Sequence, residues 1–212
     1  AHALYAGGGF AGPESAQIHR PILASHRDEY DPNVAARIEA GEGAISAQMS
    51  AAREALARGA PEDAQAGFAR ALVLAPDRHD LWSGLSQSLL RQEPDDWQRR
   101  NAVREDASAA AINAYLTAAN ADEQVAALEI LGASLVKRQL YRPAIKAWRA
   151  ALALQEQPGL RKRYDQLVAE HGFRILDHQV DADSATPRIC VVLWDLACRR
   201  TCPATYRVVR FT

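Results

Sequence analysis

The residues best suited to chemistry gather near the end of the chain, where two histidines and two carboxylates lie close together in sequence. Both side-chain types are ligands that zinc accepts. The seven-residue spacing of the histidines fits no compact zinc motif, so we consider a metal site the weaker interpretation. The stronger one is a helix end followed by the solvated face of a strand, over His171, His178, Asp181 and Asp183.

Three cysteines, Cys190, Cys198 and Cys202, lie in the same region. An odd number gives no disulfide framework, and no two of them form a C-x-x-C pair for a metal. No neighbouring base is evident that would activate a thiol as a nucleophile. Cys198 and Cys202 could pair in an oxidising compartment, so the redox state of all three stays open.

Motifs for enzymatic chemistry are missing from the sequence. It has no nucleophile elbow, phosphate-binding loop or dinucleotide fingerprint. We therefore expect no enzyme, no catalytic residue, no cofactor and no metal. A net charge of −1 predicts no nucleic-acid partner, although the arginine-rich tail around Tyr206 and Phe211 is a weak signal for one. No window reaches the roughly 18 apolar residues of a membrane span.

The first part of the chain, residues 1–43, reads as a flexible or loosely ordered leader. Glycines at 7–9 and 12, followed by Pro13, disfavour regular structure, and only a short helix is expected over 33–39. This stretch lacks both the basic start and the apolar run of a secretion signal.

Residues 44–170 carry the signals of an all-helical domain. Alanine, the best helix former, is abundant, and apolar residues recur at intervals of three to four. Gly59 ends one helix and Pro61, followed by two acidic residues, opens the next. The sequence predicts helices over 45–58, 61–74, 81–91, 107–119, 123–138, 142–154 and 158–170, joined by short loops typical of antiparallel neighbours.

A repeated pattern of small and large residues runs through these helices. The stretch 127–154 has it most clearly, with Gly132 and Ala144 as small residues and Leu131 and Trp148 as large ones. This resembles a tetratricopeptide repeat, a helix pair of about 34 residues. Degenerate copies lie upstream, interrupted by an insertion over 93–106, at Ala64, Phe68, Ala71, Pro76, Trp82, Leu85, Ala111, Tyr115 and Ala118. An irregular helical bundle remains the alternative.

Stacked repeats of this kind leave a concave surface, which is usually a protein-binding one. The resemblance implies that this groove would include Met49, Arg53, Glu129, Ala133, Val136 and Lys137. A solvated helix face is an equally open interpretation of these residues. Some tetratricopeptide domains clamp a partner's carboxyl terminus with Lys and Asn, and we reject that use because these positions hold one Lys and no Asn.

Residues 171–212 predict strands. Alternation over 173–180 and a β-branched run over 188–192 flank the turn residues 181–187. Two strands alone are marginal in water, so a truncated β-sandwich is one interpretation.

The run from Tyr141 to Val191 resembles the junction between a helical repeat region and the first macroglobulin domain of bacterial alpha-2-macroglobulin-like proteins. That family traps proteases, so the resemblance implies a periplasmic or envelope location. Residues 193–212 depart from the family pattern, which suggests a shifted reading frame or a truncation.

We therefore expect a mostly α fold of tetratricopeptide-like antiparallel helix hairpins, an α-solenoid, with a short terminal β element. The expected function is a non-enzymatic scaffold that binds a protein or peptide through its concave face. The chain would be a fragment of a protease-trapping protein or, alternatively, a free-standing adaptor. The sequence predicts neither the partner nor the oligomeric state.

Overall fold

The computed structural model describes residues 11–172, 174–181, 188–194 and 206–209, with side-chain positions over 18–172. The chain divides into two compact units, Ala1–Glu156 and Gln157–Thr212. The sequence prediction instead divides the chain after residue 170. Each unit is described below by itself.

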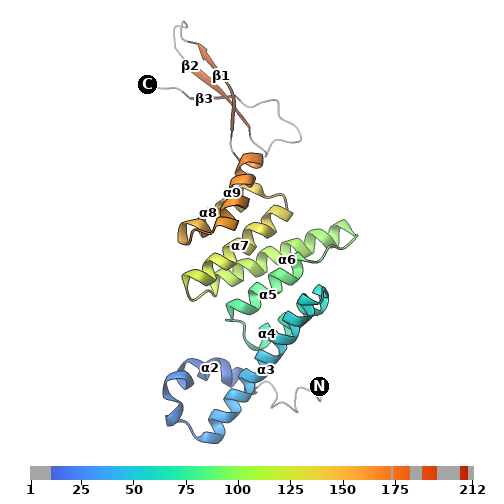
Figure 1. The fold of residues 1–212 in the computed structure, drawn as a ribbon, viewed down its shortest axis with the longest axis vertical. Coiled ribbons are helices and arrows are strands. Elements are labelled where there is room, and N and C mark those ends of the chain that lie inside the picture. Colours follow the sequence, from blue (N-terminus) through green and yellow to red (C-terminus); the bar gives the residue numbers. More distant parts are fainter. Residues whose placement is uncertain (1–10, 173, 182–187, 195–205, 210–212) are drawn as a thin grey trace. The chain divides into compact units, whose positions relative to one another are not determined.

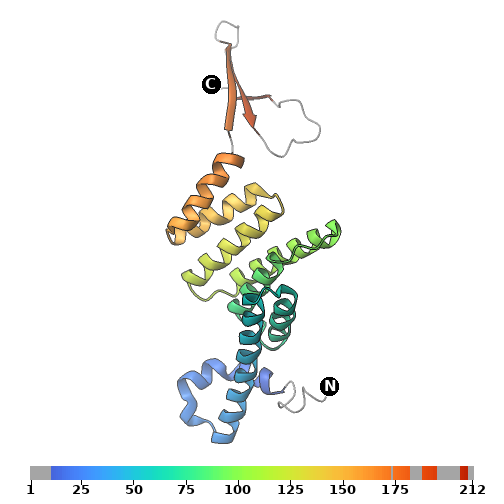
Figure 2. The ribbon, with the colours of Figure 1, turned by 45° about the vertical axis from the view of Figure 1, so that its right-hand side comes forward.

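The first unit is built from helices that follow one another as antiparallel neighbours (Figure 1). They are α2 (Ala11–His26), α3 (Pro32–Ala57), α4 (Pro61–Leu74), α5 (His79–Leu90), α6 (Trp97–Leu116), α7 (Ala121–Lys137) and α8 (Tyr141–Leu154), with a short 3-10 turn, η1 (Arg27–Glu29), after α2. Each helix packs on the next, and α5 also contacts both α3 and α7 (Figure 2). Three helix pairs, α3/α4, α5/α6 and α7/α8, therefore stack with their first helices side by side.

The core of the first unit consists of small residues opposed to a few large ones. A Cβ placed on Gly67 of α4 would lie 2.8 Å from the Cβ of Ala52 on α3. In the same way, a side chain at Gly84 would collide with Phe68, and one at Gly132 would collide with Trp148. The helices thus approach closely because Gly67 faces a small residue, while Gly84 and Gly132 each make room for a large one, as the sequence predicts for Gly132 and Trp148.

The fully buried side chains show where packing is densest. Phe68 is 1% exposed, and Ile45 and Leu81 are not exposed at all. Burying a side chain of this size stabilises the fold by about 1.5–3 kcal/mol. The buried cluster joins α3, α4 and α5 through Ile45, Ala52, Ala55, Leu56, Ala64, Phe68, Ala71, Leu72, Ala75 and Leu81.

Regular structure begins earlier than the sequence predicts, because α2 and much of α3 lie within residues 1–43. Asp31 caps α3, its Oδ1 accepting the N–H of Asn33 at 2.8 Å, and Pro32 occupies the first turn. One face of α3 is then buried at Ala35, Ile38, Gly41 and Ile45. Tertiary burial therefore keeps α3 helical across Gly41 and Gly43, which are predicted from the sequence to end a helix.

The helix α6 also starts earlier than predicted, at Trp97 rather than near residue 107. Asp96 is its N-cap and accepts the N–H of Arg99 at 2.7 Å. The charged first half of α6 contains the buried Val103, so it is helix rather than an irregular insertion.

The second unit contains α9 (Pro158–His171) and an antiparallel sheet of β1 (Arg174–Asp181), β2 (Arg188–Trp194) and β3 (Tyr206–Val209), in the order β1-β2-β3. Val180 pairs with Ile189, and Cys190 pairs with Val208. The mostly helical fold class is confirmed for the described residues. The terminal β element as the start of a β-sandwich stays a prediction.

Candidate protein-interaction groove

A groove lies on the face that α3, α5 and α7 share. It holds a cavity of about 180 Å³ whose walls come from α3, α5 and α7, with one residue of α4 beneath them. Its lining residues are Arg53 and Leu56 of α3, Phe68 of α4, His79, Asp80, Ser83, Gly84 and Gln87 of α5, and Ala126 and Ile130 of α7.

The floor of the groove is low because α5 presents small residues there. Gly84 has no side chain, so the ring of Phe68 occupies the space beneath it. Ser83 also adds little volume, and its hydroxyl lies 3.3 Å from Nε2 of His79. Gln87, one turn further along α5, is exposed at the rim. The result is a partly apolar hollow with polar groups along its edge, the usual composition of a ligand site.

One end of the groove is fixed by a histidine at the start of α5. Nδ1 of His79 lies 2.8 Å from the carbonyl oxygen of Ala114, near the end of α6. A carbonyl only accepts, so Nδ1 of His79 donates this hydrogen bond, and Nε2 lies on the side of the Ser83 hydroxyl. This orientation ties α5 to α6 and holds the imidazole edge at the cavity.

The charged wall of the groove is a network centred on Arg78, which directly precedes α5. Its Nε and Nη2 donate to the two carboxylate oxygens of Asp80 at 3.0 and 2.7 Å. Its Nη1 donates to Glu42 of α3 at 2.8 Å. Burial alone would raise the pKa of Asp80, but the hydrogen bonds and charge of Arg78, with a contribution from Arg53, lower it. Asp80 is therefore held ionised.

Arg53 has the most available donors in the groove. Asp80 already accepts two hydrogen bonds from Arg78, so Arg53 reaches it only at 3.7 Å and its side chain stays 56% exposed. Within the described part of the chain, the Arg53 guanidinium makes no hydrogen bond. Its planar fork of N–H groups can therefore bind a carboxylate or a backbone carbonyl of another molecule.

The predicted groove residues fall in different places. Arg53 lines the cavity, whereas Met49 packs against the core cluster and its sulfur lies 3.8 Å from Nη2 of Arg78. On α7 the cavity is lined by Ala126 and Ile130. The predicted residues Glu129, Ala133 and Val136 belong to the same helix but are not among the residues that line the cavity. The binding roles of all these positions stay predictions.

Lys137 serves the fold itself. Its ammonium donates to the carbonyl of Leu90 at 2.7 Å, and it also forms an ion pair with Glu93. Arg91, at the end of α5, makes the equivalent contact with the preceding helix pair and donates to the carbonyl of Leu56 of α3 at 3.0 Å. Cationic side chains thus satisfy the last carbonyls of α3 and α5, where the helix dipole also favours positive charge. Sequence reasoning missed this role, although a basic residue at the end of each first helix is its signal.

The residues singled out for metal chemistry lie at the edge of what the structure describes. His171 ends α9, and its Nε2 is 3.8 Å from Glu170. The side chains of His178, Asp181 and Cys190, and the whole of Asp183, Cys198 and Cys202, lie outside the described residues. Among the residues that are described, no three histidines, cysteines or carboxylates gather as a metal site, and no helix has the length and apolarity to cross a membrane.

Comparison with known proteins gives a likeness in structure and none in sequence. No family model and no curated protein matches the sequence. Among solved structures, the chain is similar to the "N-terminal domain of stress-induced protein-1 (STI-1) from C.elegans", at 15% identity and a TM-score of 0.48. That alignment covers 59% of this chain and 94% of the other.

Proposed function

We propose that this protein is a non-enzymatic scaffold whose α3, α5 and α7 bind an extended peptide segment of a protein partner. The observation that carries the proposal is the cavity walled by α3, α5 and α7 over Phe68 of α4, with an apolar floor and a polar rim. A peptide lying across these helices would place an apolar side chain over Phe68. Its acceptors would meet the free donors of Arg53.

The test is a peptide selection with the purified chain, followed by affinity measurements on two groove variants. Gln87→Trp fills the groove from an exposed position, and Arg53→Glu reverses its available charge. We expect each to weaken the selected peptide by about tenfold or more, which corresponds to about 1.4 kcal/mol.

Matched controls make the same chemical change away from the groove. Gln98→Trp replaces an exposed glutamine near the start of α6, and Arg70→Glu reverses an exposed charge on α4. Both should bind like the unaltered protein. If a groove variant binds the peptide as tightly as its control, the peptide lies elsewhere and the proposal fails.

The finer assignment, to an alpha-2-macroglobulin-like protease trap in the periplasm or envelope, rests on the junction motif over 141–191. We propose it as the setting of the scaffold, with a free-standing adaptor as the alternative. Sequencing the flanking DNA and translating all three frames tests it. Further alternating strands and a Cys-Gly-Glu-Gln-like motif in another frame would support the trap, and their absence would favour the adaptor.

A further inference from the structure

The second half of α2, residues 18–26, lies beside the first half of α3. Over residues 18–26, where its side chains are described, none is buried, and Leu23 is only partly covered. By contrast, α4 buries five residues along one face. Pro21 also lies inside α2 and removes one of its backbone hydrogen bonds. Over residues 18–26, therefore, neither buried side chains nor an unbroken set of backbone hydrogen bonds holds α2 strongly.

Between α2 and α3 lies a hollow of about 360 Å³. Leu23 and Ala24 of α2 face Ile38 of α3 across it. A well-packed helix interface leaves no space of this size, and the atoms that line such a space lose dispersion contacts. The apolar contact that Leu23 and Ala24 make with α3 is correspondingly weak.

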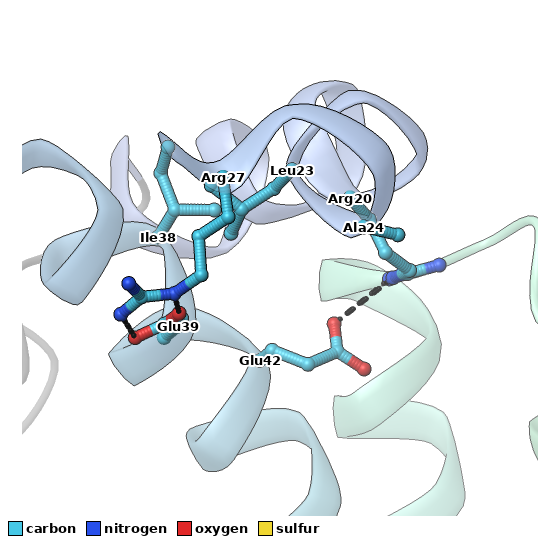
Figure 3. Close-up of a pocket in the computed structure, with 7 residues that line it drawn as sticks. All are labelled: Arg20, Leu23, Ala24, Arg27, Ile38, Glu39 and Glu42. Atoms are coloured by element: carbon cyan, nitrogen blue, oxygen red, sulfur yellow. Dashed lines mark hydrogen bonds and ion pairs between the residues drawn. The ribbon is translucent and has the colours of Figure 1, made fainter. Parts of the chain in front are cut away.

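Ion pairs bridge the two helices on both sides of this hollow (Figure 3). On one side Arg27, just after α2, donates two hydrogen bonds to Glu39 at 2.7 and 3.3 Å. On the other, Arg20 contacts Glu42 at 3.0 Å and reaches Asp77 at 3.6 Å. The hydrogen bonds from Arg27 lower the pKa of Glu39. A further hydrogen bond links α2 to the segment before α3, where Nδ1 of His19 lies 2.8 Å from the hydroxyl of Tyr30.

From this arrangement we infer that the second half of α2, residues 18–26, is a detachable segment, latched to α3 chiefly by the Arg27–Glu39 and Arg20–Glu42 ion pairs. Exposed ion pairs are weak and are screened by salt, whereas apolar packing is not. Raising the ionic strength therefore releases α2 while the rest of the first unit stays folded. Release uncovers Ile38, which is 4% exposed in the latched state, and so presents an apolar surface on α3.

The test is amide hydrogen exchange of the full chain at about 50 mM and about 1 M NaCl, since the screening length falls from more than 10 Å to about 3 Å over this range. We expect exchange across residues 18–26 to accelerate roughly fivefold in high salt, with α4, α5 and α7 unchanged. Unchanged or slower exchange in α2 would overturn the inference, because a helix held by apolar packing responds in that way.

Two variants with a matched control sharpen the test. Glu39→Gln should accelerate exchange in α2 at low salt and reduce its response to added salt. Glu54→Gln removes a carboxylate from the same helix, where its only described ion pair is with Arg58 within α3, and should change neither. If Glu39→Gln behaves like Glu54→Gln, the latch does not exist.

A charge swap separates the ion pair from a general effect of mutation. Arg27→Glu combined with Glu39→Arg keeps the pair with its charges exchanged. The double variant should restore slow exchange in α2 at low salt and its acceleration at high salt. A double variant that exchanges as fast as either single one would contradict the latch.

Discussion

The contact between Gly132 and Trp148 sets how closely α7 and α8 approach. The Trp148 indole lies where a side chain at 132 would stand, and its Nε1 donates to the carbonyl of Glu129 at 3.0 Å. Gly132→Ala should therefore destabilise the protein by about 1–3 kcal/mol through overpacking, in spite of alanine's better helix propensity. Urea unfolding measures the change.

Gly43 provides the matched control for that substitution. It lies inside α3 with open space where a Cβ would be. Gly43→Ala should stabilise the protein by about 0.5–1 kcal/mol, since only helix propensity changes. If both substitutions shift the free energy of unfolding in the same direction, the contact with Trp148 does not exclude a side chain at position 132.

The pairing of Asp80 with Arg78 should make the free energy of unfolding depend on pH in the acid range. Its folded-state pKa lies below the ordinary value of about 3.9, although burial opposes the shift, because Arg78 donates two hydrogen bonds to it. The stabilisation is therefore complete above pH about 4 and is lost as the pH falls through the folded-state pKa. Asp80→Asn cannot titrate, so its free energy of unfolding should fall less between pH 7 and pH 3 than that of the unaltered protein.

The control for Asp80 is Asp106→Asn on the exposed face of α6, where the described residues offer this carboxylate no ion pair. Its pH dependence should match that of the unaltered protein. If the free energy of unfolding of Asp80→Asn falls between pH 7 and pH 3 as much as that of the unaltered protein, the Arg78–Asp80 pair contributes nothing to the acid sensitivity.

Residue by residue, the sequence predicts packing within a helix pair better than packing between pairs. Gly132 and Trp148 stand at repeat spacing inside one pair, so their contact follows from the pattern. The contact of Gly84 with Phe68 joins two pairs, and Gly84 is not among the packing residues that we predict from the sequence. The availability of the Arg53 donors could not be predicted from the sequence, because only the structure shows that Arg78 already donates to both carboxylate oxygens of Asp80.

At the scale of elements, strong local signals predict the helices well. Pro61 opens α4, and α8 and α9 run within a residue or two of their predicted bounds. The sequence fails where tertiary burial overrides a local breaker, as at Gly41 in α3, or where a helix is charged on most of its surface, as in the first half of α6. Propensity is only a weak guide at such places.

The link from α7 to the turn after α5 depends on one ammonium group. Lys137→Met removes its hydrogen bond to the Leu90 carbonyl and its ion pair with Glu93. We expect a loss of about 1–2 kcal/mol in the free energy of unfolding, since the carbonyl loses its cationic partner.

Lys146 on the exposed face of α8 gives the matching control for that change. Lys146→Met should stay within about 0.5 kcal/mol of the unaltered protein, as surface substitutions usually do. Equal urea midpoints for the two variants would rule out a bracing role for Lys137.

For the molecule as a whole, the arrangement of helix pairs matters more than any single side chain. Each pair of the first unit contacts its neighbours, and the groove exists only because α3, α5 and α7 lie side by side. With a net charge of −1, long-range attraction contributes little to partner choice. Recognition should therefore depend on shape and on the few polar groups at the groove rim.

The most direct test of this account is to titrate the isotope-labelled chain with a selected peptide and follow its amide chemical shifts. The account predicts that the shifts concentrate along α3, α5 and α7, at Arg53, Ser83, Gln87 and Ile130, together with Phe68 beneath the groove, while α6, α8 and the rest of α4 change little. Shifts confined to α4, α6 and α8 would place the peptide on the second helices of the pairs and contradict the central claim.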